Sequence, residues 1–134
     1  MNGVRRTNIS TGTIWEPIVG YSRAVRVGAY VYVSGTTATD EDGKIVGIDN
    51  PYLQTVKVIR NIESTLQRAS ATLQNVIRTR IYTTNIDYWK EIGKAHSEFF
   101  QEIRPASTMV EVRRLITSEA LVEIEADALI IHLI

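Results

Sequence analysis

The most constraining feature of the sequence is the segment LVEIEADALI at residues 121–130, in which apolar and acidic residues alternate. Successive side chains of a β-strand point to opposite faces of the sheet. One face therefore receives the apolar residues, and the other face receives Glu123, Glu125 and Asp127. The segment predicts a strand that lies on a hydrophobic core with one face and carries three carboxylates on the other.

Two further segments show the same alternation, with arginine among the charged residues. In residues 76–83 the two sets are Ile77, Thr79 and Ile81, expected to face the core, and Arg78, Arg80 and Tyr82, expected to face away from it. In residues 108–115 they are Val110 and Val112, expected to face the core, and Glu111 and Arg113. Charges of both signs on three strands favour subunits that pack sheet to sheet, with charges paired at the seam or lining a wet cleft. A solvated sheet face with cross-strand pairs is the alternative.

Two segments carry the signals of amphipathic helices. Asn50 followed by Pro51 marks a helix start, because asparagine caps the first turn and proline suits the first helical position. Apolar residues then recur at spacings of three and four, which predicts a helix over residues 51–70. These residues are Leu53, Val56, Ile59, Ile62, Leu66 and Ala69.

A second helix is expected to begin near Ile86 and to end at Arg104, because Pro105 disfavours a helical conformation in the residue before it. Its apolar face is predicted to contain Trp89, Ile92, Ala95, Phe99 and Ile103. His96 lies close to this face in the helical projection. We expect it at the edge of the core, and a place in a cleft is the alternative.

The remaining segments predict strands and turns. Residues 1–20 are expected to be irregular or to form short strands, and residues 24–34 to form one strand. The acidic and glycine residues of 40–44 predict a hairpin turn, followed by a short strand in IVGI. Two strands are expected near 108–115 and 121–133. This order predicts an α+β sandwich with two helices on one face of a mostly antiparallel sheet.

The composition excludes several kinds of site. The 134 residues fit one domain over 1–134, and 15 basic against 15 acidic residues give no basic footprint for nucleic acid. The absence of cysteine excludes a disulfide scaffold and a thiol nucleophile. Two distant histidines and the lack of phosphate-binding glycine motifs predict no metal and no cofactor. With no signal peptide and no run long enough to span a membrane, we expect a cytoplasmic protein without a membrane partner.

Several short motifs, in order and with compatible spacing, resemble the RidA/YjgF family, whose members are also labelled L-PSP endoribonuclease. The resemblance covers about residues 17–131. Its pieces are GYSRAVRVG (20–28), VSGTTA (33–38), QT (54–55), NIESTLQRA (61–69), VIRTRIY (76–82), HSEFF (96–100), RPASTMVEVRRL (104–115) and LVEIEADA (121–128). The resemblance implies a chorismate-mutase-like single domain with a six-stranded sheet. It also implies a homotrimer whose three sheets form a barrel, with clefts between neighbouring subunits.

In the deaminase branch of this family, the clefts hydrolyse enamine and imine intermediates to keto acids and ammonia. The resemblance maps the cleft tyrosine to Tyr21 and the Ser-Gly backbone pair to Ser34 and Gly35. It maps the glutamate that positions water to Glu123. The arginine that clamps the substrate carboxylate falls at Ser107, and the family's cleft cysteine falls at Met109.

The serine at position 107 argues against the standard imine deaminase activity. A guanidinium offers a fixed fork of donors to a carboxylate, whereas serine offers one hydroxyl. Arg80 and Arg23 are candidates to replace the missing arginine. For each, local pairing with a carboxylate such as Glu123 or Glu125 is the structural alternative.

We therefore expect a homotrimer that binds a small carboxylate, imine or carbonyl metabolite in its intersubunit clefts. A deaminase or related hydrolase activity on that metabolite is the first functional hypothesis. Glu123 is the expected catalytic residue. The expected ligand contacts are Tyr21, Ser34, Gly35, Arg80, Ser107 and Thr108. The alternatives are a non-catalytic ligand-binding or chaperone-like trimer, and an endoribonuclease or translation inhibitor.

Overall fold

The computed structural model describes residues 4–131, which form an α+β fold with one six-stranded mixed sheet. The strands are β1 (Arg6–Ile9), β2 (Ala24–Val27), β3 (Tyr30–Thr36), β4 (Val76–Thr83), β5 (Ala106–Glu111) and β6 (Val122–Leu129). The helices are α1 (Trp15–Val19), α2 (Pro51–Arg68) and α3 (Trp89–Phe100), with 3-10 turns at Leu73–Asn75 and Ile86–Tyr88. The order in the sheet is β1-β2-β3-β6-β4-β5. All neighbours are antiparallel except β4 and β5, which are parallel.

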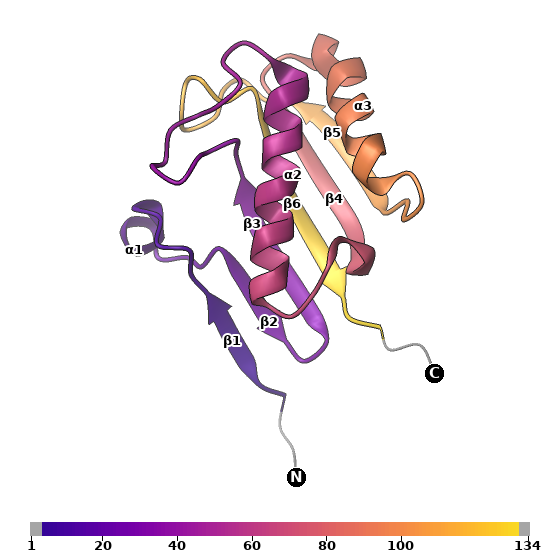
Figure 1. The fold of residues 1–134 in the computed structure, drawn as a ribbon. Helices are drawn as coiled ribbons and strands as arrows, with labels where there is room; N and C mark the ends of the chain where they lie inside the picture. Colours follow the sequence, from indigo (N-terminus) through magenta and orange to yellow (C-terminus); the bar gives the residue numbers. More distant parts are fainter. Residues whose placement is uncertain (1–3, 132–134) are drawn as a thin grey trace.

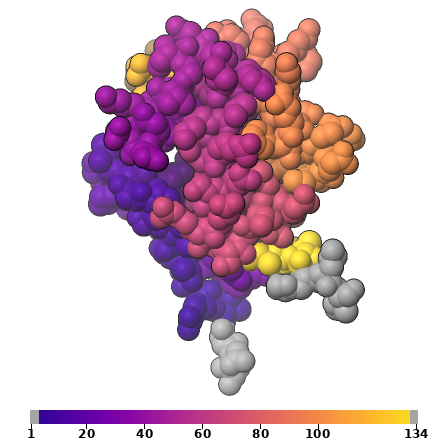
Figure 2. Space-filling model, in the orientation of Figure 1, coloured from indigo at the N-terminus to yellow at the C-terminus, as the bar shows by residue number. Residues whose placement is uncertain are grey.

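Helices α2 and α3 lie side by side on one face of this sheet (Figure 1). In Figure 2 the magenta and pink atoms of α2 and the orange atoms of α3 cover the middle of that face. The core lies between these helices and the sheet, and Val31, Ile59, Ile92 and Ile124 are fully buried in it. We call the other side of the sheet the open face, because no described helix packs on it.

The predicted start of the first long helix is confirmed. The side chain of Asn50 accepts a hydrogen bond of 3.0 Å from the Leu53 N–H, and Pro51 occupies the first helical turn. The predicted apolar face is only partly right, because Leu53 is half exposed while Gln54 and Thr55 are fully buried. The helix therefore buries two polar side chains that its apolar periodicity does not indicate.

Gln54 is buried because it holds two loops together. Its side-chain amide donates to the carbonyl oxygens of Gly47 and Glu119, at 3.2 and 2.9 Å. Its carbonyl oxygen accepts from the Leu121 N–H at 2.8 Å. A buried amide with all these partners satisfied fixes the loop that leads into β6.

The prediction of one strand over 24–34 is wrong. The segment is a hairpin, β2 and β3, whose turn contains Gly28 at a φ of 59°. A positive φ is accessible to glycine at little cost, so the chain reverses there. The turn at residues 40–44 is present, with the Asp40 N–H donating to the Lys44 carbonyl, but the short strand predicted after it reduces to a single bridge between Thr39 and Ile45. The short helix α1 also lies in a segment expected to be irregular or to form short strands.

The alternation of β6 is confirmed, since Val122, Ile124, Ala126 and Ala128 are buried beneath the helices and the acidic residues lie on the open face. The predicted strand over 121–133 ends at Leu129, and residues 132 and 133 lie outside the described residues. The predicted strand over 76–83 is also confirmed. However, Ile77 is exposed, because the pairing with β6 is irregular between Val76 and Arg78 and leaves Ile77 without a register partner.

The faces predicted for residues 108–115 are wrong. Strand β5 spans Ala106–Glu111 and pairs in parallel with β4, with Met109 beside the buried Ile81 and Val110 beside Tyr82. Register partners in neighbouring strands share a face. Met109 therefore packs against the core, while Val110 points to the open face and is 41% exposed. Val112 lies beyond the end of the strand.

The helix expected to begin near Ile86 starts with a 3-10 turn there and continues as α3, which ends at Phe100 rather than at Arg104. Ile92 and Ala95 are fully buried as predicted, but Trp89 is 55% exposed. The side chain of Trp89 instead lies within 5.7 Å of the Lys90 ammonium group, measured to the ring centroid. Among the described residues no helix is long and apolar enough to cross a membrane.

Candidate functional site

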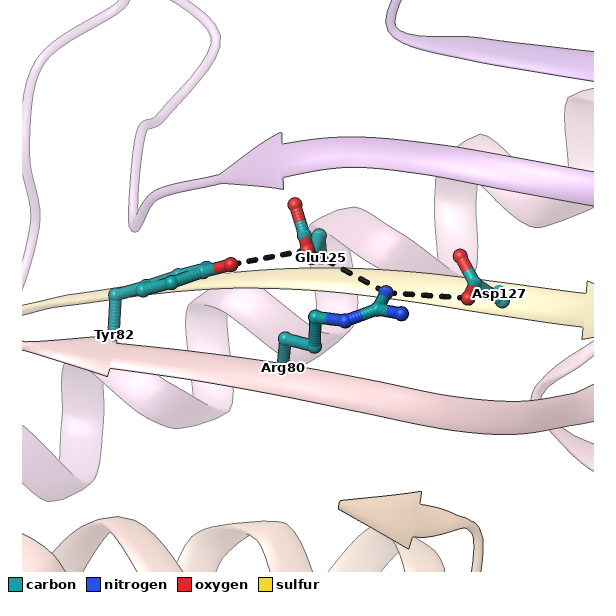
Figure 3. Close-up of polar contacts among 4 residues, drawn as sticks. All are labelled: Arg80, Tyr82, Glu125 and Asp127. Atoms are coloured by element: carbon teal, nitrogen blue, oxygen red, sulfur yellow. Dashed lines mark hydrogen bonds and ion pairs between the residues drawn. The ribbon is translucent and has the colours of Figure 1, made fainter. Parts of the chain in front are cut away.

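The open face carries a polar network in its centre, built by β4 and β6. The Nη1 atom of Arg80 contacts both Asp127 Oδ2, at 3.2 Å, and Glu125 Oε1, at 3.5 Å. The hydroxyl of Tyr82 donates to the same Glu125 oxygen at 3.1 Å (Figure 3). Burial raises the pKa of Tyr82, and the hydrogen bond to Glu125 adds to the rise. Arg80 thus has local acidic partners, as the structural alternative predicts.

A shallow hollow of about 290 Å³ lies beside this network on the open face. Its lining includes Tyr32, Ser34, Arg80, Glu125 and Asp127. Two of the residues predicted to contact a ligand, Ser34 and Arg80, therefore line one hollow. The ring of Tyr32 also stacks on that of Tyr30, with centroids 6.2 Å apart, so an aromatic surface borders the charged one.

The pairing of β3 with β6 is interrupted where the sequence reads Ser34-Gly35. Val33 pairs with Ala126 and Thr36 pairs with Ile124, so two residues of β3 oppose the single residue Glu125. This is a β-bulge, a feature that bends a strand and redirects its groups. An isolated glycine in a strand pattern signals such a bulge or a close approach, so the sequence held this information.

The bulge brings the backbone of Gly35 against the carboxylate of Glu123. A Cβ atom at position 35 would overlap Glu123 Oε2 and lie 3.0 Å from Cδ. Only glycine therefore fits here with the carboxylate in its present place. Burial raises the pKa of Glu123, the charge of Arg23 opposes the rise, and the charge of Glu125 adds to it. None of the described residues makes a hydrogen bond or an ion pair with this carboxylate.

Arg23 also holds the bulge, a role that sequence reasoning missed. Arg23 is only 7% exposed. It donates to the carbonyl oxygens of Gly35 and Ser34 at 3.0 and 3.3 Å, and to Thr36 Oγ1 at 2.6 Å. Its fourth contact, at 3.4 Å, is the Tyr21 hydroxyl. Arg23 therefore positions the Ser34-Gly35 backbone and Tyr21, and its donors are largely occupied.

Ser107 lies on the helix side of the sheet, away from the open face. Its hydroxyl accepts a hydrogen bond of 2.8 Å from Thr79 Oγ1, and the same Thr79 oxygen lies 2.9 Å from His96 Nε2. Thr79 is 1% exposed, and burial lowers the pKa of His96. His96 also contacts the Phe100 ring at 4.6 Å between centroids, which confirms its expected place at the edge of the core. This chain of three polar groups joins α3, β4 and β5.

Within one chain, the predicted site residues thus lie in separate groups. Tyr21, Ser34 and Gly35 gather around Arg23, and Glu123 adjoins Gly35. Thr108 pairs with Arg80 in the register of β4 and β5, so it lies on the open face. Ser107 is separated from these residues, because it lies on the helix side of the sheet. Within residues 4–131 no group of three or more histidine or acidic side chains could hold a metal ion.

Comparisons with known proteins agree with this architecture. The family model described as Endoribonuclease L-PSP matches residues 12–130. A RutC family protein from Pyrococcus abyssi is 38% identical over 114 residues, covering 84% of this chain and 88% of the relative. A Rid family protein from Yersinia pestis, of unknown function, has a crystal structure with 30% identity and a TM-score of 0.84, covering 94% of this chain and 100% of that one.

A member of the YjgF/YER057c/UK114 family from Mycobacterium tuberculosis is more similar. Its crystal structure has 48% identity and a TM-score of 0.86, and the match covers 94% of this chain and 100% of that one. Strands β2 to β6, helices α2 and α3 and the motifs along the chain all lie within the residues 12–130 that the family model matches. The chain therefore belongs to the Endoribonuclease L-PSP family, the group that also carries the names YjgF, RutC, UK114 and Rid.

Proposed function

We propose that the chain forms a homotrimer whose intersubunit clefts bind a small imine, enamine or carbonyl metabolite and hydrolyse it, with Glu123 as the catalytic residue. The observation that carries this proposal is the environment of Glu123. Its carboxylate is partly buried against Gly35, has a raised pKa, and makes no hydrogen bond with a described residue. A carboxylate with these properties can take a proton from water near neutral pH.

The open face supports the trimer. It exposes aromatic and apolar side chains from three strands, namely Val27, Tyr30, Tyr32 and Val110. A face that combines such residues with the Arg80 network suits packing against another sheet. Ser107 is exposed on the edge strand β5, whereas Glu123 lies on the open face. We propose that Ser107 of one subunit and Glu123 of the next line the same cleft.

The proposed reaction is a hydrolysis with balanced proton transfers. Glu123 takes a proton from a water molecule while the water oxygen bonds to the imine carbon, and the electron pair of the C=N bond moves to nitrogen. The proton then passes from Glu123 to that nitrogen. The hydroxyl group of the resulting carbinolamine then gives its proton to Glu123, which passes it to the amino nitrogen. The C–N bond breaks as the carbonyl forms, and ammonia leaves. Arg23 contributes by holding the Ser34-Gly35 backbone against the site.

The serine at position 107 favours substrates that need no bidentate carboxylate clamp. One hydroxyl, held by Thr79, can make a single hydrogen bond with a carbonyl or imine group. Arg80 keeps two carboxylate partners, so recruiting it would leave Glu125 and Asp127 without their cation. A neutral or singly hydrogen-bonding ligand group is therefore the better fit at Ser107.

The test measures ammonia release from imines without a carboxylate, which a flavin-dependent amine oxidase generates from primary amines in the assay. Glu123→Gln is expected to lower the rate at least a hundredfold, in the range for loss of a general base. Glu63→Gln, which removes a carboxylate on α2, is the matched control and is expected to keep the wild-type rate. Equal rates for both variants would reject the role of Glu123.

A second experiment tests the shared cleft. Ser107→Ala is expected to lower kcat/KM by about five- to tenfold, as for one lost hydrogen bond. Mixed trimers of Glu123→Gln and Ser107→Ala subunits then contain some clefts with both native residues, so they should be more active than either parent. A monomer in solution, or mixtures no better than the parents, would contradict the shared cleft. Ligand binding without turnover would indicate a non-catalytic role, and salt-resistant RNA cleavage would indicate the nuclease alternative.

A further inference from the structure

Three arginines line a second hollow, on the helix side of the sheet. This hollow has a volume of about 300 Å³, and residues of β1, of β2 and of the C-terminal end of α2 line it. Figure 1 shows where these three elements lie in the fold. Its basic lining residues are Arg5, Arg26 and Arg68, and Thr7 and Ser70 contribute hydroxyl groups. We call it the arginine hollow.

No acidic residue is part of this lining. Arg26 donates from Nη1 to the Ala69 carbonyl oxygen at 2.7 Å and from Nε to the Gly28 carbonyl oxygen at 2.9 Å. Arg68 donates from Nη1 to the Ser10 carbonyl oxygen at 3.1 Å. These partners are uncharged, and the salt bridges among the described residues involve only Arg60 and Arg80. The positive charge of the hollow is therefore not balanced by a described carboxylate.

The contacts of Arg26 and Arg68 also fix their positions. Arg26 is held from two sides, by the turn of the β2–β3 hairpin and by the end of α2. Each guanidinium has five N–H donors, so both keep donors beyond those used for the carbonyls. Thr7 is the register partner of Arg26 and shares its face of the sheet. The hollow thus combines spare, oriented donors with uncompensated charge.

We propose that the arginine hollow binds a phosphate-bearing small molecule with two or more phosphate groups. Guanidinium groups match phosphate oxygens in paired hydrogen bonds, and a multivalent anion can neutralise several arginines at once. The volume reaches the lower end of the range for small-molecule sites, which is larger than a single carboxylate needs. This site lies on the opposite side of the sheet from Arg80 and does not depend on the proposed hydrolysis.

The test is calorimetric titration of the full chain with inorganic pyrophosphate at low ionic strength. Arg68→Gln and Arg5→Gln are each expected to raise the Kd at least tenfold. Arg60→Gln makes the same charge change on the same helix, where Arg60 is paired with Glu63 at 3.0 Å, and should leave the Kd within about twofold. Thermal unfolding of each variant confirms that it folds.

Two further titrations distinguish the sources of phosphate. ATP is expected to compete with pyrophosphate, and its affinity should respond to Arg68→Gln in the same way. A single-stranded RNA oligonucleotide is expected to bind more weakly than ATP. The proposal is overturned if millimolar pyrophosphate does not bind, if Arg60→Gln weakens binding as much as the other variants, or if only RNA binds.

Discussion

The carboxylate of Glu123 occupies the space that a side chain at Gly35 would need. The two residues lie on adjacent strands, at a bulge that Arg23 holds in place. This relationship links the conformation of the proposed catalytic group to a backbone position, and it leads to the first prediction.

Gly35→Ala is expected to displace Glu123 or the bulge and to lower the free energy of unfolding by about 1–3 kcal/mol, as overpacking does. Urea unfolding measures the change. Gly93→Ala is the matched control, because a Cβ there meets nothing within 4 Å. It lies inside α3 and should stabilise the protein by about 0.5–1 kcal/mol. Adding Glu123→Ala to Gly35→Ala should recover much of the loss. No recovery would show that the overlap with Glu123 is not the cause.

The raised pKa of Glu123 predicts a specific pH dependence of stability. Burial disfavours its charged form in the folded state, so the folded state holds the proton to higher pH than the unfolded state, whose value is 4.5. This group's contribution to stability therefore decreases as pH rises from 4.5 to the raised folded pKa. Glu123→Gln removes that loss, so the stability of the variant relative to wild type should increase through this window and then level off. Urea unfolding between pH 4 and 8 measures it, and a constant difference would contradict the assignment.

Thr79→Val is expected to break the chain of polar groups between His96 and Ser107. It removes the hydroxyl that lies between them, and the expected loss is about 1–3 kcal/mol for buried groups left unpaired. Thr79→Ser keeps the hydroxyl and should lose less. Urea unfolding compares the two variants, and equal losses would show that the lost methyl group, not the hydroxyl, matters.

The pKa of the His96 ring provides an independent test of the same region. Burial lowers its folded pKa below the ordinary 6.5, so the unfolded state takes up a proton first as pH falls. Its contribution to stability is present above pH 6.5 and decreases as pH falls from there toward the folded pKa. Proton NMR titration of the His96 ring should give a midpoint below 6.5 in the folded protein. A midpoint at or above that value would contradict the burial of the ring.

Gln54→Leu is expected to destabilise the protein by about 2–4 kcal/mol, although it replaces a polar side chain by an apolar one in the core. The substitution leaves the Leu121 N–H and the Glu119 carbonyl without their partner, while the Gly47 carbonyl keeps only the Asn50 N–H. Gln67→Leu lies on the same helix at an exposed position and should change stability by less than about 0.5 kcal/mol. Urea unfolding of both variants measures the contrast.

Local patterns in the sequence predict the elements whose signals are also local. The alternation around Glu123 predicts β6 and its two faces, and Asn50 predicts the start of α2. The sequence does not predict which face of β5 meets the core, because the residues on each of its two faces include an apolar side chain. Met109 rather than Val110 faces the core because β5 pairs in parallel with β4, and that pairing is a tertiary event.

In the candidate site, too, local sequence patterns predict single residues but not the contacts between them. Gly35 within a strand pattern signals a close approach, but the sequence does not say that Glu123 is the group approached. The contacts between His96, Thr79 and Ser107 join a helix and two strands that are distant in sequence. The role of Arg23 likewise depends on the bulge it supports. Periodicity assigns side chains to faces, whereas these contacts depend on how the elements are placed against one another.

The place of β6 in the sheet has a consequence for synthesis of the protein. This strand pairs with β3 on one side and with β4 on the other, so it joins two parts of the sheet that are otherwise separate. A chain still on the ribosome and lacking residues 122–129 has β1-β2-β3 and β4-β5 but no strand that pairs with both groups. Contacts between distant parts of a chain form late and slow folding. Completion of the core must therefore wait until translation has passed β6 and the ribosome has released this strand from its exit tunnel.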